Sequence, residues 1–272
     1  MYRADAPPEM RSVGETEFVN GIAAMSASGI YGPTRACAGI VGFADLSLGE
    51  RVRDIFEAHL AAGGNRFRGI RHIVAWDASE DIPRSYPNPP EGLLRDAVFR
   101  RGFAQLAPLG LTFDAWLYHP QLPELLDLAR AFPGTTIVLD HAGGPLGIGP
   151  YRQRHAEVFD RWKRAITDLA HCPNTVVKLG GLGMRTGMFD FHARATPPSS
   201  VALAAAWRPY VETCIEAFGP ARCMFESNYP VDGVTCSYAV LWNAFKRLAS
   251  GASAAEKVAL FEDTARRVYR LD

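Results

Sequence analysis

Short apolar runs alternate with longer amphipathic segments along this chain, and this alternation constrains its fold more than any other feature. Each run has the length and residue types of a β-strand, and each is followed by a segment with helical spacing. Strands that alternate with helices form parallel sheets, so we expect an α/β fold of the TIM-type (β/α) barrel class. The six predicted strands lie at residues 36–45, 67–76, 111–121, 137–139, 174–182 and 222–232.

Helices are predicted before the first strand, between successive strands and after the last one. Ser253 is the expected N-cap of the final helix, and two loops rich in proline or glycine, residues 77–92 and 184–199, are long enough to shape a site. The predicted helices cover residues 14–27, 49–62, 93–106, 122–131, 156–171, 201–218, 237–248 and 254–268.

A closed barrel of this type has eight strands, whereas only six are predicted here. Either the sequence starts from an internal methionine of a longer protein, or the barrel is open where its first two strands should be. The first explanation is our preferred interpretation. No linker divides the chain, so we expect a single domain over residues 1–272, and an exposed barrel flank favours a homo-oligomer.

Charge and cysteine content limit the classes of partner. Lys plus Arg and Asp plus Glu each number 29, so nothing indicates nucleic acid or an acidic membrane as a partner. The five cysteines form no Cys-x-x-Cys pair, which indicates reduced thiols. No apolar run of about 18 residues occurs, and the polar N-terminus does not resemble a signal peptide. We therefore expect a cytoplasmic protein that acts on a small molecule.

The segment from Thr135 to Pro145 combines a buried strand, a histidine and a glycine turn. His141 follows the apolar run Ile137-Val-Leu139, at the carboxyl end of a strand, where parallel α/β folds place their chemistry. Strand alternation predicts that Ile137, Leu139 and His141 share one face, so that the apolar pair fills the barrel beneath the histidine.

Several motifs in order along nearly the whole chain resemble the amidohydrolase superfamily. They are most similar to its amidohydrolase-related branch of predicted metal-dependent TIM-barrel hydrolases, which includes sugar lactonases and 2-pyrone-4,6-dicarboxylate lactonase. The similar segments are Gly69-Ile-Arg-His-Ile-Val-Ala-Trp-Asp77, Trp116-Leu-Tyr-His-Pro-Gln-Leu122, Val138-Leu-Asp-His-Ala-Gly143, Val177-Lys-Leu-Gly-Gly-Leu182, Ser227-Asn-Tyr-Pro230 and Glu262-Asp-Thr-Ala-Arg-Arg-Val-Tyr-Arg-Leu271.

The resemblance implies a role for His141 as a metal ligand or as a hydrogen-bond donor to the substrate carbonyl. Two departures from the family pattern matter. The first strand of the family ends in a His-x-His pair, and no two histidines of this chain are two residues apart. A single divalent metal such as zinc is a possible cofactor, and the absence of the His-x-His pair puts it in doubt. The last strand usually ends in Ser-Asp-x-Pro, whose Asp is the general base, and Asn228 replaces that Asp here.

Asn228 has no basic group at neutral pH, so another residue must activate water if the chain is hydrolytic. Asp232 is the first candidate and Glu226 the second, and the alternative is that Asp232 only stabilises the turn before Gly233. By parity Met224, Glu226 and Asn228 share one face, which places Glu226 one layer below Asn228.

Four side chains are candidates for binding the substrate: Arg71, His119, Lys178 and Asn228. Arg71 and its neighbour His72 point to opposite faces, and we choose Arg71 as the one inside the barrel, where it binds a carboxylate or forms a structural ion pair. Lys178 is costly to bury unless it is paired, and Glu226 is its predicted partner.

The leading hypothesis is a hydrolase that opens a lactone or cyclic ester of a small organic or sugar acid. In it His141, with His119 or a metal, polarises the carbonyl group, Arg71 holds a carboxylate or hydroxyl, and Asp232 or Glu226 activates water. One alternative is a non-oxidative decarboxylase of the same superfamily. The other is a truncated or catalytically inactive barrel.

Overall fold

A computed structural model of the chain describes residues 1–85 and 88–271. Its centre is one sheet of six strands in which each strand pairs in parallel with the next along the chain. In the described part of the chain no ladder joins the last strand to the first, so the barrel is open on that side. The strands are β1 (Ile40–Gly42), β2 (Phe67–Ile73), β3 (Thr112–Trp116), β4 (Ile137–Leu139), β5 (Thr175–Leu179) and β6 (Cys223–Phe225).

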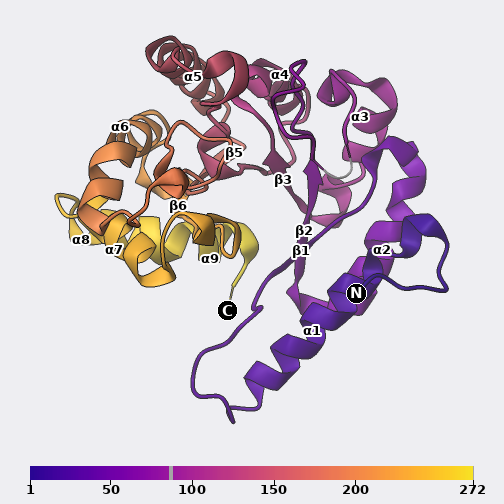
Figure 1. The fold of residues 1–272 in the computed structure, drawn as a ribbon. Coiled ribbons are helices and arrows are strands. Elements are labelled where there is room, and N and C mark those ends of the chain that lie inside the picture. The colour runs from indigo at the N-terminus through magenta and orange to yellow at the C-terminus, as the bar shows by residue number, and fades with distance from the viewer. Residues whose placement is uncertain (86–87, 272) are drawn as a thin grey trace.

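Helices surround the sheet, and Figure 1 shows α2 to α7 arranged around its outside in chain order. All the predicted helices are present, although 3-10 turns shorten some of them, and Ser253 caps α8 as expected. The helices are α1 (Val13–Ala27), α2 (Val52–Gly63), α3 (Ala97–Phe103), α4 (Leu122–Ala131), α5 (His155–Ala170), α6 (Ser200–Phe218), α7 (Tyr238–Leu248), α8 (Ala254–Val258) and α9 (Thr264–Tyr269), the last two joined by a π-helical turn.

The sheet has an outer apolar core and a smaller inner one. Ile137 and Leu139 of β4 belong to the outer core that packs against the helices. Val138 lies instead in the inner cluster, with Val176 of β5, Met224 of β6 and Val268 of α9. The prediction that the apolar pair fills the barrel beneath His141 is therefore wrong, because the opposite residues of β4 face inward.

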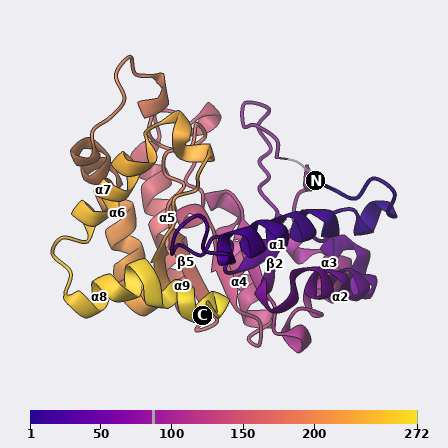
Figure 2. The same cartoon turned by 90° about the horizontal axis from the view of Figure 1, so that it is seen from below.

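The two ends of the chain lie near the open side of the sheet. Figure 2 shows α1 lying along α2, and α9 contacts β6 at the other end of the chain. Arg68 of β2 donates to the backbone carbonyls of Tyr269 and Arg270, which attaches the C-terminal segment to the other end of the sheet. The same attachment brings the side chain of Tyr269 into the barrel interior.

Both long loops expected from the sequence are present, although residues 86–87 of the first lie outside the described part. Asp77 accepts a hydrogen bond from Tyr151, and Ser85 donates to the carbonyl of Ala75. All five cysteines are free, and no helix in the described residues is long and apolar enough to span a bilayer.

Candidate active site

The carboxyl end of β4 brings His141 to the mouth of the barrel through an unusual backbone turn. His141 and Ala142 have φ values of 55° and 49°, a region that non-glycine residues seldom adopt. This turn breaks the strand alternation, so Asp140 and His141 are both available on the inner side. Space for the imidazole depends on Gly181 after β5, where an added Cβ would lie 2.4 Å from the Cβ of His141.

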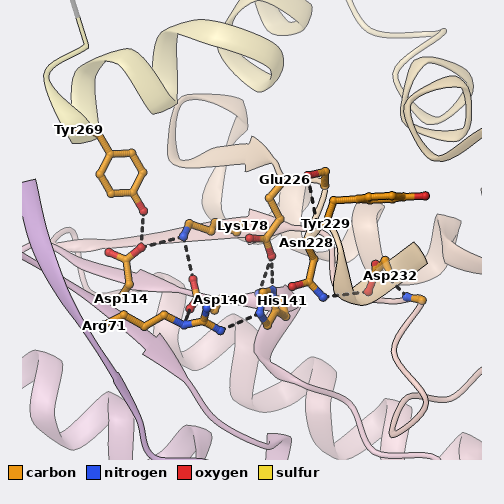
Figure 3. Close-up of polar contacts among 12 residues, drawn as sticks. Arg71, Asp114, Asp140, His141, Lys178, Glu226, Asn228, Tyr229, Asp232 and Tyr269 are labelled. Carbon is orange, nitrogen blue, oxygen red and sulfur yellow. Dashed lines mark hydrogen bonds and ion pairs between the residues drawn. The ribbon is translucent and has the colours of Figure 1, made fainter. Parts of the chain in front are cut away.

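Glu226, just after β6, fixes the orientation of His141. Its Oε1 atom lies 2.5 Å from Nδ1 of His141 and 3.0 Å from the backbone nitrogen of the same residue (Figure 3). The ring of Trp116 packs against the imidazole at 4.7 Å between centroids. The two side chains are also buried, since only 5% of His141 and 15% of Glu226 is exposed. The imidazole ring therefore has little freedom to rotate.

Arg71 of β2 faces the other nitrogen of the same imidazole. Its Nη2 atom lies 3.1 Å from Nε2 of His141. A guanidinium has only donors, so Nε2 must accept and the ring proton must sit on Nδ1, where Glu226 accepts it. The arrangement gives a neutral imidazole. Its one basic lone pair, at Nε2, points at the Arg71 side chain, which is 40% exposed. Its neighbour His72 packs in the outer core against Phe43 and Phe99, as the parity argument predicts.

A buried ion network continues from Arg71 into the barrel (Figure 3). Asp140 lies 2.9 Å from Nε of Arg71 through one oxygen and 2.9 Å from Nζ of Lys178 through the other. Lys178 also donates to Asp114 at 2.7 Å, and the hydroxyl of Tyr269 donates to the same Asp114 oxygen at 2.6 Å. The predicted pair of Lys178 with Glu226 is wrong, because two closer carboxylates take the ammonium and Glu226 binds His141.

Burial and charge act in opposite directions on these groups. Burial alone raises the pKa of Asp140, but the charges of Lys178 and Arg71 outweigh it and hold that pKa below its ordinary value. At Asp114 burial dominates, and the pKa of this carboxyl is raised. Burial lowers the pKa of Lys178, yet the two carboxylates raise it well above its ordinary value. Lys178 is thus a permanent cation and not a nucleophile.

Asn228 and Asp232 form a separate contact next to this network. The Asn228 amide donates to Oδ1 of Asp232 at 2.8 Å, and the backbone nitrogen of Gly183 donates to Oδ2 at 3.3 Å. Asp232 is fully buried, and burial raises its pKa to about 6. Its carboxylate is directed at the loop after β5 and holds that loop against the one after β6.

His119 has different surroundings from the other predicted site residues. It begins a 3-10 turn after β3, is 1% exposed, packs edge-on against Tyr151 and accepts the backbone N–H of Leu146. Burial lowers its pKa to about 3, so it is neutral in the folded protein. None of the contacts found in the described residues connects His119 with Arg71, His141 or Glu226.

The residues present do not fit a resident metal ion. Among residues 1–85 and 88–271 no three His, Cys, Asp or Glu side chains are grouped so that they could hold one. The lone pair of His141 at Nε2, which a metal would need, faces the positive guanidinium of Arg71.

Two cavities meet at Arg71. The larger, about 900 Å³, lies between α1 and the carboxyl ends of β1 and β2. The second, about 470 Å³, reaches Asp114, Lys178 and Tyr269 inside the barrel. Arg71 lines both cavities and also touches His141, so a molecule in either cavity can contact Arg71 next to the imidazole.

Three residues of the network, Asp114, Asp140 and Tyr269, were not predicted from the sequence as site residues. Asp140 stands next to His141 in the motif Val138-Leu-Asp-His, and an acidic residue directly after an apolar strand was the available signal. Asp114 lies within the strand β3. No local signal marks Tyr269, which is 155 positions from the carboxylate it binds.

Comparison with known proteins places this geometry in a family. The family model for amidohydrolases matches residues 7–271. The chain is 39% identical over 233 residues to an uncharacterised protein of Sinorhizobium fredii, covering 86% of this chain and 70% of that protein. It is 31% identical over 239 residues to an L-fucono-1,5-lactonase of Burkholderia multivorans, covering 86% of this chain and 72% of that protein.

A solved structure shows the same similarity in three dimensions. The crystal structure of an amidohydrolase from Burkholderia multivorans, with bound zinc, superposes with a TM-score of 0.73 at 29% identity. The superposition covers 95% of this chain and 80% of that one. The open six-stranded sheet is therefore a TIM-type barrel arrangement.

Proposed function

This chain belongs to the amidohydrolase family and is a hydrolase, and from that premise we propose that it opens a lactone of a small organic or sugar acid by adding water. One observation carries the proposal: a row of Glu226, His141 and Arg71 places a carboxylate, an imidazole with its basic lone pair at Nε2 and a cation in sequence. Relatives named as lactonases support the choice of a cyclic ester over other hydrolysable bonds.

His141 is the general base in this proposal. Glu226 holds the proton on Nδ1, so Nε2 accepts a proton from water as the water oxygen attacks the lactone carbonyl carbon. The role differs from that of a donor to the carbonyl, since a neutral imidazole protonated at Nδ1 cannot donate through Nε2.

Arg71 stabilises the charge that develops on the lactone carbonyl oxygen. Asp140 holds Nε of the Arg71 guanidinium while Nη2 moves from Nε2 of His141 to the carbonyl oxygen of a lactone in the larger cavity, where it stabilises the negative charge of the tetrahedral intermediate. The intermediate then breaks its ring C–O bond, and the departing alkoxide takes the proton from His141. The product is the open-chain hydroxy acid, and no other co-reactant than water is consumed.

The experiment uses the purified chain and a panel of aldonolactones and simple lactones, with acid release followed by a pH indicator. Acid release from at least one lactone is expected, and His141→Ala should abolish it. His171→Ala, an exposed histidine at the end of α5, is the matched control and should retain the rate. Full activity of His141→Ala would refute the role of His141. Carbon dioxide release from an acid, with no lactone opened, would refute the hydrolase.

A further inference from the structure

We propose that Asp140 and Lys178 are positioning residues, a buried pair that fixes the guanidinium of Arg71 against His141, and that Tyr269 of α9 anchors this pair from the other side. The inference rests on the proposed function, because it assigns Arg71 a task in it. Figure 3 shows the residues as a continuous row from Tyr269 to Glu226.

Asp140 is the member that touches both cations. Each of its oxygens takes a different partner, Nζ of Lys178 at 2.9 Å and Nε of Arg71 at 2.9 Å. The carboxylate is 1% exposed, so water does not replace either contact. Rotation of the carboxylate would break at least one of the two contacts. The position of Asp140 therefore sets the position of the Arg71 guanidinium, which would otherwise move freely in the two cavities.

Lys178 is fixed in turn by groups beyond Asp140. Its Nζ atom donates to Asp114, and the Tyr269 hydroxyl donates to the same Asp114 oxygen. The Tyr269 ring also lies 5.5 Å from Nζ, within the range of a cation–π contact. Four neighbouring strands, β2 to β5, and helix α9 each contribute one side chain, so the backbone register of the sheet determines the geometry.

Charge balance argues for positioning and against anion binding. Arg71 and Lys178 carry two positive charges, and Asp114 and Asp140 carry two negative ones when ionised. The network therefore offers no excess positive charge to a substrate carboxylate. Buried ion pairs seldom stabilise a fold more than apolar residues of the same size would. The network is costly to bury, and its benefit is that it fixes the donor atoms of Arg71.

The first test measures His141 directly and needs no substrate. In protein with ¹⁵N-labelled histidine, wild type should show the neutral ring with its proton on Nδ1 and an Nε2 resonance shifted by a hydrogen-bond donor. Asp140→Asn should shift Nε2 towards the value of an unbonded imidazole nitrogen, as Arg71→Ala does. Unchanged His141 resonances in folded Asp140→Asn would overturn the proposal.

The second test is a double-mutant cycle on the lactone that wild type opens. Asp140→Asn should lower kcat about a hundredfold with a smaller change in KM, because the donor is misplaced and not removed. In the Arg71→Ala background the same change should cost nothing further, since the two residues act as one unit. Equal effects in both backgrounds would overturn the proposal. If wild type opens no lactone, the proposed function fails and the ¹⁵N measurement alone decides the inference.

Tyr269→Phe provides a milder variant that keeps the ring and removes only the hydroxyl. It should lower kcat about threefold to tenfold and shift the His141 resonance in the same direction as Asp140→Asn. Tyr210→Phe is the matched control, a buried helical tyrosine that packs against Trp162 and makes none of the contacts of the network among the described residues. Equal kcat values and equal His141 resonances in the two tyrosine variants would show that Tyr269 does not help to position Arg71.

Discussion

A single oxygen of Glu226 accepts both the Nδ1 proton and the backbone N–H of His141, at 2.5 Å and 3.0 Å. This double contact joins β6 to the turn after β4. It orients the ring and selects its tautomer in one interaction. The chemical consequences depend on this contact, and four predictions follow from it and from its surroundings.

Glu226→Gln should lower kcat by about 10²-fold to 10⁴-fold while the protein stays folded, because an amide no longer enforces the Nδ1 proton on His141. Initial rates on the lactone that wild type opens, together with a thermal melt, measure the effect. Glu212→Gln, an exposed side chain of α6 paired with Arg208, is the control and should behave as wild type. A rate for Glu226→Gln close to that of wild type would contradict the role assigned to the carboxylate.

Gly181→Ala should abolish most activity, because its Cβ would lie 2.4 Å from that of His141. Gly110→Ala is the control, since Gly110 also has a positive φ, 64° against 68°, but has no atom within 4 Å of an added Cβ. Both variants should lose about 1–2 kcal/mol of stability from the backbone strain. Only Gly181→Ala should also displace His141. Kinetics and denaturant unfolding of the two proteins separate these effects, and equal loss of activity would show that the clash is irrelevant.

Asp232 should make the stability of the protein depend on pH. Burial raises the pKa of this carboxyl to about 6, above its ordinary value of 3.8, so the folded state holds the proton more tightly than the unfolded one. The contribution to stability is full below the unfolded pKa and is lost as pH rises from about 4 to about 6, with a total of at most about 3 kcal/mol.

Asp232→Asn cannot ionise and should lack this loss. Urea unfolding at steps between pH 4 and pH 7.5 measures the free energy of unfolding of both proteins. The difference between wild type and variant should move in favour of the variant as pH rises from about 4 to about 6, and it should stay constant above that range. A parallel pH dependence of the two proteins would show that Asp232 does not titrate in this range.

Removal of metal should leave the reaction unchanged. The basic lone pair of His141 faces Arg71, and the residues described here form no cluster of three metal-binding side chains. Protein treated with a chelator and checked for metal by mass spectrometry should keep the rate of untreated protein. Added zinc should inhibit if it competes with Arg71 for Nε2. A rate lost on chelation and restored by zinc would contradict the prediction.

The order and type of the elements were predictable from sequence because both depend on local patterns. Six apolar runs separated by helical spacing gave the strands and helices, and the placement of polar residues at strand ends indicated His141 and Glu226. The resemblance to amidohydrolases also came from local motifs, and the family match confirms it. The opposite directions of Arg71 and His72 followed from the alternation of an uninterrupted strand, whereas Arg71 was chosen as the inward residue because a guanidinium can bind a carboxylate.

The partners of these side chains were decided only by tertiary structure. Strand alternation failed at His141, because a positive φ turns the chain there and no residue type nearby demands it. Lys178 was assigned to Glu226, yet it binds Asp114 and Asp140, whose distance from it depends on the register of three strands. Such contacts join residues far apart in the chain, and a local pattern carries no information about their distance. The sequence by itself determined the order of the elements and placed His141 and Glu226 at strand ends, and the packing of the sheet determined which side chains meet there.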